Sequence, residues 1–155
     1  EAAVIAVDQG NNPVLSTGND TISVCASQGN TAFALSLADF GNSTDMSVSG
    51  CPAGASCNYS VNPVNNPANS TNLNITGLAG VTPNGYGLTA TGTDSVDGNI
   101  TDDLSLTLNV LAAAGNAGLS QPSSGATGVS TLPDFSWSAG TQASSYTIEI
   151  ATDAI

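Results

Sequence analysis

The 155 residues include no lysine, no arginine and no histidine. In ordinary globular proteins about a quarter of the residues are charged, with both signs present. Here only 12 acidic side chains carry charge, so the formal net charge is −12. Without cationic side chains the chain has nothing to neutralise phosphate backbones, which argues against a nucleic-acid partner. It also lacks the groups that attract anionic lipid headgroups.

The missing histidine removes several kinds of catalytic chemistry. Ser–His–Asp triads and Cys–His pairs need an imidazole base, and histidine-ligated zinc is excluded as well. Carboxylate pairs could in principle work as acid and base. However, Glu1 and Glu149 are the only glutamates, and the side chains of Asp102 and Asp103 diverge if they are neighbours on a strand. We therefore expect a protein that is not an enzyme and requires no cofactor.

Long apolar runs are also missing: none reaches 18 residues, so no membrane insertion is expected. Apolar residues make up 40% of the chain and charged residues 8%, which fits a packed core and not a charge-rich disordered chain. Repulsion among carboxylates opposes compactness. We therefore expect stabilisation by added salt, by Ca²⁺ and by mild acid near the pI of about 4.1.

Apolar and polar residues alternate along much of the chain, which is the pattern of half-buried β-strands. The clearest run is Leu104 to Val110, with an aliphatic row on one face and small polar residues on the other. Turn-forming Gly, Pro, Asn and Asp separate the runs, and no amphipathic helix of ten residues is evident. This pattern predicts an all-β fold, an antiparallel β-sandwich. Strands are expected at 4–7, 21–26, 31–37, 45–49, 56–61, 73–75, 86–88, 89–93 and 104–110.

A composition change divides the chain. Residues 112–118 are small, flexible and uncharged, as in linkers. We expect a sandwich domain at 1–111 and a second strand-rich segment at 119–155. In that second segment Phe135 and Trp137 share one face, as do Tyr146, Ile148 and Ile150. The aromatic residues Phe135, Trp137 and Tyr146 are expected to be core residues, with a ligand-binding platform as the alternative.

Three cysteines allow one disulfide. Cys51 and Cys57 flank a short loop containing Gly and Pro, and we expect them to be bonded. Two reduced thiols, or a pair that includes Cys25, are the alternatives. Cys25 lies in an alternating run and is expected to be a buried free thiol. A disulfide would indicate an oxidising, extracellular compartment.

The densest group of oxygen ligands is Asp94, Asp97, Asn99 and Asp102, around Gly98. Carboxylate and amide oxygens in a glycine-containing loop suit Ca²⁺, although the spacing is not that of an EF-hand. The alternative is a solvated hairpin loop without metal.

Six Asn-X-Ser/Thr sequences are candidate glycosylation sites. Their number is only slightly above what this composition would give by chance. They lie at Asn19, Asn42, Asn58, Asn69, Asn74 and Asn99.

Several short motifs resemble accessory regions of secreted bacterial proteins, notably those that follow the catalytic domains of metalloproteases and subtilases. Residues 51–56 read Cys-Pro-Ala-Gly-Ala-Ser and 86–93 read Tyr-Gly-Leu-Thr-Ala-Thr-Gly-Thr. The family has an apolar residue where Cys51 stands, which suggests an added bridge. The resemblance covers 21–110 and implies an Ig-like sandwich. Its further motifs are 23–25, 60–64 and 73–76.

Residues 133–138 and 145–153 resemble the B and C strands of a fibronectin type III-like domain. Such a sandwich needs about 90–100 residues, and only about 40 follow the linker. Either the chain is part of a longer protein, or a neighbouring copy supplies the missing strands.

These observations together predict a secreted, non-catalytic structural or adhesive module of a multidomain bacterial protein. The expected partners are its own parent polypeptide, copies of itself, or a polysaccharide or protein surface. The alternative is a subunit of an extracellular filament or adhesin assembled by strand complementation.

Overall fold

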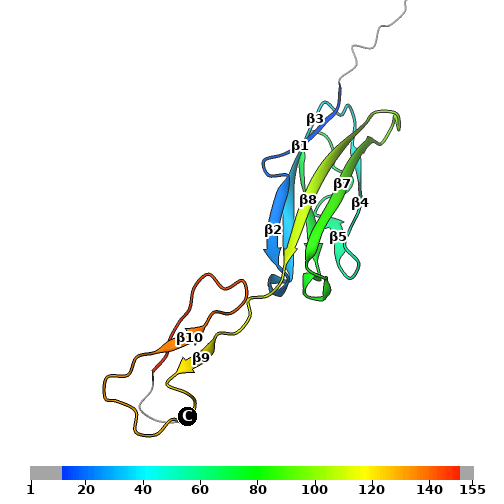
Figure 1. Ribbon diagram of the computed structural model, residues 1–155. Coiled ribbons are helices and arrows are strands. Elements are labelled where there is room, and N and C mark those ends of the chain that lie inside the picture. Colours follow the sequence, from blue (N-terminus) through cyan, green and yellow to red (C-terminus); the bar gives the residue numbers. More distant parts are fainter. Residues whose placement is uncertain (1–11, 151–155) are drawn as a thin grey trace, which may run out of the picture. The chain divides into compact units, whose positions relative to one another are not determined.

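The computed structural model describes residues 12–150. The chain divides into two compact units, Glu1–Leu111 and Ala112–Ile155. The first is an all-β sandwich of two four-stranded sheets (Figure 1). One sheet has the order β1 (Val14–Thr17), β3 (Asn30–Ala38), β6 (Ser70–Thr76) and β5 (Ser56–Tyr59). The other has the order β2 (Thr21–Cys25), β8 (Thr101–Leu111), β7 (Asn84–Asp94) and β4 (Thr44–Ser49).

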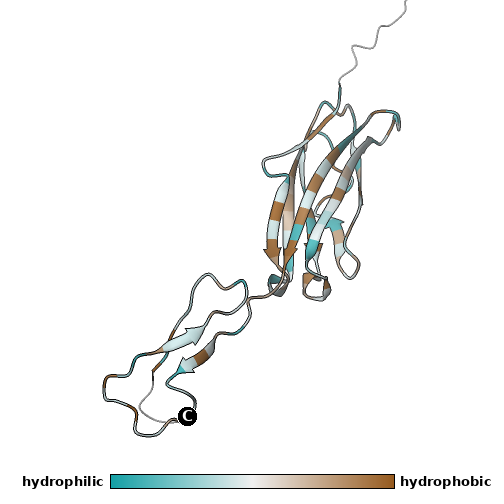
Figure 2. Cartoon of the chain, viewed as in Figure 1, coloured by the Kyte–Doolittle hydropathy of each residue, from teal (hydrophilic) through white to brown (hydrophobic). Residues whose placement is uncertain are grey.

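The expected alternation places the core between the two sheets. In β3, Phe33, Leu35 and Leu37 point inward and are at most 6% exposed, while Ala32 and Ala34 face solvent. Figure 2 shows the same alternation as bands of apolar and polar residues along the strands. The opposite sheet contributes apolar residues from β7 and β8. The buried apolar residues are Leu15, Val24, Phe33, Leu35, Leu37, Met46, Val64, Leu73, Ile75, Leu78, Val81, Leu88, Ala90, Leu106, Leu108 and Val110.

Several strands differ from their expected bounds. The two short runs expected at 86–88 and 89–93 belong to one strand, β7, because it pairs without interruption with β8 from Asn84 to Thr93. β1 was not expected from the sequence. The strand expected at 4–7 lies outside the described residues. Two short 3-10 helices, η1 (Ala26–Gln28) and η2 (Leu78–Gly80), complete the first unit.

The sequence pattern predicted antiparallel sheets, but one pair of strands is parallel. β2 pairs in parallel with β8, from Thr21 opposite Thr107 to Cys25 opposite Leu111. β1 pairs antiparallel with β3 in the other sheet. The chain therefore changes sheets between Thr17 and Thr21, and alternation alone carries no information about such a change because it is the same in both sheets.

The free edge of β4 is covered by the loop after β5, in which Val64 pairs with Thr44 in an isolated bridge and Asn62 contacts Met46. The amide of Asn62 accepts a hydrogen bond from Met46 N at 2.8 Å and donates one to Met46 O at 2.8 Å. At Met46 the Asn62 side chain thus takes the place of a neighbouring strand. Beyond β4, Gly50 adopts φ +81°, and a Cβ there would lie 2.2 Å from the Gly87 carbonyl oxygen. Only glycine fits this close approach to β7.

The second unit has a small two-stranded sheet. β9 (Gly118–Gln121) pairs antiparallel with β10 (Ser136–Ser138), with an irregular register between Ser136 and Trp137. No apolar side chain of this unit is buried within residues 112–150. A lone two-stranded sheet is marginally stable at best, so the unit leaves apolar surface uncovered.

Two expectations for this unit are wrong. Residues 146–150 form no strand, although their alternation is that of a strand. Phe135, Trp137 and Tyr146 are 39%, 44% and 41% exposed and do not form a core. Both corrections have one cause: no opposing sheet is present in this part of the described chain to pair with the segment or to cover the rings.

No helix among residues 12–150 is long and apolar enough to cross a membrane.

Candidate functional site

The acidic hairpin between β7 and β8 is organised around Asp94, which is 1% exposed. Its Oδ1 accepts hydrogen bonds from the backbone N–H of Val96 at 2.9 Å and of Asp97 at 3.1 Å. Oδ2 accepts one from the backbone N–H of Asn42 at 3.0 Å, and Asn42 Nδ2 lies 3.1 and 3.3 Å from the two oxygens. Asp94 therefore joins the hairpin to the loop between β3 and β4.

These hydrogen bonds determine the ionisation of Asp94. The N–H groups of Val96 and Asp97 lower its pKa below the ordinary value of 3.8, and burial opposes them. The amide of Asn42 lowers the pKa further. N–H donors stabilise the carboxylate form, so the side chain is held ionised without a cation.

The structure does not gather Asp94, Asp97, Asn99 and Asp102, the side chains of the expected calcium site, around one centre. Asp97 Oδ1 accepts bonds from the backbone N–H and the Nδ2 of Asn99, both at 3.0 Å. Asp102 Oδ2 accepts one from Leu15 N at 2.6 Å. Each side chain thus binds nearby N–H groups in place of a shared centre. Across residues 12–150 no three acidic or cysteine side chains gather as metal ligands.

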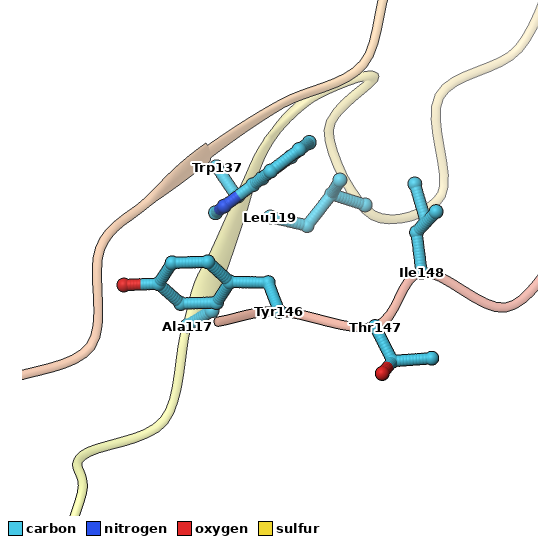
Figure 3. Close-up of a pocket in the computed structure, with 6 residues that line it drawn as sticks. All are labelled: Ala117, Leu119, Trp137, Tyr146, Thr147 and Ile148. Carbon is cyan, nitrogen blue, oxygen red and sulfur yellow. The ribbon is translucent and has the colours of Figure 1, made fainter. Parts of the chain in front are cut away.

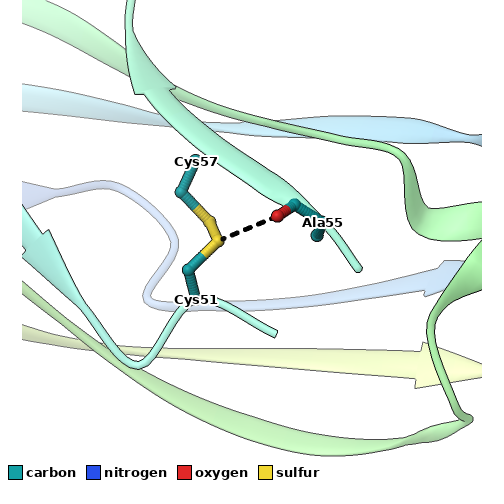
Figure 4. Close-up of a disulfide and its surroundings, with 3 residues drawn as sticks. All are labelled: Cys51, Ala55 and Cys57. Atoms are coloured by element: carbon teal, nitrogen blue, oxygen red, sulfur yellow. Dashed lines mark hydrogen bonds between the residues drawn. A yellow bond between two sulfur atoms is a disulfide. The ribbon is translucent and has the colours of Figure 1, made fainter. Parts of the chain in front are cut away.

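The expected disulfide joins Cys51 to Cys57, with Cα atoms 6.1 Å apart (Figure 4). It closes the turn between β4 and β5. The dashed line in Figure 4 joins Cys51 Sγ to the carbonyl oxygen of Ala55, 3.9 Å away. This is a van der Waals contact and not a hydrogen bond, because a disulfide sulfur has no S–H to donate.

Cys25 is the free cysteine of the described chain. We expected a buried thiol, but the side chain is only half-buried. It stands at the end of β2, an edge strand, and its side chain follows the outward row of Thr21 and Ser23. The alternation at 22–25 therefore identified the strand correctly, but assigned Cys25 to the wrong face.

The six sequon asparagines differ in their surroundings. Asn19, Asn58 and Asn69 are exposed, and Asn74 is half-buried opposite Asn58 in the register of β5 and β6. Asn42 and Asn99 are exposed, but their Nδ2 atoms donate to Asp94 and Asp97. The nitrogen that a sugar would modify is thus already engaged at these two positions.

The second unit contains an apolar groove of about 220 Å³ (Figure 3). The rings of Trp137 and Tyr146 lie 6.1 Å apart between centroids, tilted by 56°. Leu119 of β9 lies beside them at 55% exposure, and Ile148 lies near Leu119 at 53%. No lining residue is charged. The full lining is Ala117, Leu119, Trp137, Tyr146, Thr147 and Ile148.

Two tyrosines that the sequence did not single out tie the sandwich together. The hydroxyl of Tyr86, early in β7, donates to Thr82 O at 2.7 Å. The hydroxyl of Tyr59 in β5 donates to Ser47 O of β4 at 2.7 Å, which joins the two sheets. A tyrosine near the start of a strand and just after a turn could have suggested the first bond, but the second spans two sheets and needs the tertiary structure.

The outer faces of the sandwich are largely neutral. On β7, Thr89, Thr91 and Thr93 face outward while Leu88 and Ala90 are buried. They stand opposite Ser105, Asp103 and Thr101 of β8. The other sheet presents Ala, Asn and Ser from β3 and β6. Hydroxyl and amide groups therefore dominate the surfaces available for contact.

Comparisons with protein-family models, with curated proteins and with solved structures find no match.

Proposed function

We propose that this chain is a non-catalytic, extracellular structural module of a secreted bacterial protein. It consists of an Ig-like sandwich followed by a fibronectin type III-like segment. In this proposal it separates or presents other parts of the protein and contacts partners, a polysaccharide or protein surface, through neutral polar faces.

The strand order supports the Ig-like assignment. Ig sandwiches place strands A, B, E and D in one sheet and C, F and G in the other. The orders β1-β3-β6-β5 and β4-β7-β8 correspond to these, with β2 added beside β8. The Tyr86 bond to Thr82 O corresponds to the tyrosine corner of strand F.

The extracellular location is supported by the Cys51–Cys57 disulfide, because such bonds persist mainly in oxidising compartments. The complete absence of Lys and Arg adds resistance to trypsin-like proteases, an advantage outside the cell.

The observation that carries the spacer role is the direction in which the chain crosses the first unit. Near the point where the chain enters the unit, Leu15 N donates a hydrogen bond to Asp102, at the beginning of β8. The chain leaves the unit at Leu111, the end of β8. The ten residues from Asp102 to Leu111 make nine steps along β8, which span about 30 Å. Entry and exit are thus at opposite ends of the sandwich (Figure 1), and a load between them pulls the parallel strands β2 and β8 in shear.

Single-molecule pulling tests this role. Handles at residues 12 and 112 of the full chain load all five β2–β8 residue pairs together. Handles at 83 and 112 instead open the β7–β8 hairpin one pair at a time, because Asn84 lies opposite Val110. We expect a higher unfolding force with the first pair. An equal or lower force would reject the spacer role, and turnover of a substrate by the purified protein would reject the non-catalytic one.

A second candidate is a filament subunit completed by strands from neighbouring copies. The uncovered apolar residues of the second unit favour it, since an open apolar face and free strand edges promote association.

A further inference from the structure

The second unit presents an acceptor surface for a β-strand. β9 and β10 each have a single partner among the described strands, so each keeps one edge with unpaired backbone groups. The groove beside them is apolar and uncharged, and Leu119 and Ile148 are more than half exposed. Backbone pairing at an edge combined with pockets for alternate side chains is how added strands are recognised.

The charge of the molecule limits what can enter this groove. Every charged side chain in the protein is acidic, so two copies repel each other wherever carboxylates meet. An uncharged segment of one copy against an uncharged groove of another avoids this cost. The occupant that fits is an extended, apolar stretch without Asp or Glu.

Among the residues that belong to no described strand, one segment has this character. Residues 2–7 read Ala-Ala-Val-Ile-Ala-Val, between Glu1 and Asp8. Extended, six residues span about 20 Å, enough to run along β9. Period-two alternation puts Ile5 and Val7 on one face and Val4 on the other. The Ile5 face is the bulkier one.

We propose that residues 2–7 of one copy add as a strand to the second unit of another copy, with Ile5 and Val7 in the groove lined by Leu119, Trp137, Tyr146 and Ile148. This inference rests on the filament candidate and names its donor and acceptor. Repeated from copy to copy, it produces a head-to-tail polymer in which each subunit covers the apolar face of the next.

The test uses the only tryptophan of the chain, Trp137, as a reporter in the groove. The full chain should form concentration-dependent chains in sedimentation velocity at high salt. The double variant Ile5→Asn/Val7→Asn should be monomeric, with red-shifted Trp137 emission. The control Val4→Asn/Ala6→Asn, which places two asparagines on the opposite face, should still assemble.

A peptide of residues 1–10 provides the second arm. Added to the Ile5→Asn/Val7→Asn variant, it should shift Trp137 emission to the blue, whereas the same peptide with both asparagines should not. Assembly that persists in the double variant would overturn the donor assignment while leaving the filament candidate standing. A wild-type chain that is monomeric up to millimolar concentration would overturn both, and the spacer role would be unaffected.

Discussion

At the scale of single residues, the absence of cations shifts the work of holding charge to backbone N–H groups. Asp94 is the clearest case, since it is buried and has no basic side chain anywhere in the chain to pair with. Three N–H groups of the main chain and the amide of Asn42 surround it. A buried charge is tolerated only when it is hydrogen-bonded in this way.

Replacing Asp94 by asparagine should lower the melting temperature and change its dependence on pH. Because the folded pKa of Asp94 lies below 3.8, its contribution to stability is complete above that value and is lost as the pH falls through the folded pKa. Melting temperatures measured from pH 6 to pH 2 should therefore fall less steeply at the acid end for the variant than for the wild type. Asp45→Asn removes the same charge from an exposed site and should keep the wild-type profile; matching profiles for all three proteins would contradict the role of Asp94.

Tyr59 gives an alkaline counterpart. Burial raises its pKa from 10.0 to about 12. A raised pKa stabilises the fold below pH 10, and this contribution is lost as the pH rises toward 12. Phenolate absorbance at 295 nm should show a component titrating near pH 12 that disappears in Tyr59→Phe and persists in Tyr146→Phe. If Tyr59→Phe leaves that component in place, the assignment is wrong.

At the scale of elements, the edges of the first unit are closed by local devices. Asn62 satisfies both backbone groups of Met46 on β4, and Asp102 accepts the N–H of Leu15 on β1. Exposed edges invite pairing with other chains. These side chains therefore help to prevent such pairing at the first unit, whereas β9 and β10 of the second unit each keep an unpaired edge.

Asn62→Ala should destabilise the first unit by about 1–3 kcal/mol, because it leaves the N–H and C=O of Met46 without their partner. Urea denaturation followed by circular dichroism measures this change. Asn65→Ala, at an exposed position of the same loop, serves as the control and should change stability little. Equal effects of the two substitutions would show that Asn62 does not act through Met46.

The disulfide acts on the turn between β4 and β5. Its seven-residue loop predicts a contribution of about 2.4 kcal/mol from chain entropy. Cys51→Ser/Cys57→Ser should lower the free energy of unfolding by about that amount, measured in urea. Cys25→Ser keeps the bridge and should change stability less. A double variant as stable as the wild type would mean that the loop is already held by its own contacts.

At the scale of the whole molecule, a net charge of −12 without any cation makes repulsion a general term in the stability. Salt shortens the screening length from about 10 Å at 0.1 M to about 3 Å at 1 M. Mild acid toward the pI lowers the charge, until protonation of Asp94 opposes the gain.

We therefore expect the melting temperature to rise as NaCl is added. It should also rise as the pH is lowered from 7 to about 4.5. CaCl₂ and MgCl₂ should act alike at equal concentration, since the carboxylates of the acidic hairpin each accept hydrogen bonds from separate N–H groups and share no centre. Differential scanning calorimetry measures all three effects. A Ca²⁺-specific increase would restore the calcium site, and a melting temperature indifferent to NaCl would show that the charges are too far apart to matter.

The sequence alone determined the all-β class and most strands of the first unit, and it favoured the disulfide partners that the structure shows. These follow from alternation with period two and from cysteines close in sequence, which are local signals. Residues such as Phe33, Leu73 and Leu108 could be assigned to a core because their neighbours along the strand are small or polar.

Only the tertiary structure decided which side chains meet across the chain. It showed that Asp94 links two loops, a contact that the sequence could not predict because Asn42 lies 52 residues away. It also left Trp137 and Tyr146 exposed, since an alternating pattern specifies an inward face but cannot supply the opposing sheet. Pairing and burial depend on contacts between distant segments, and these have no counterpart in local sequence.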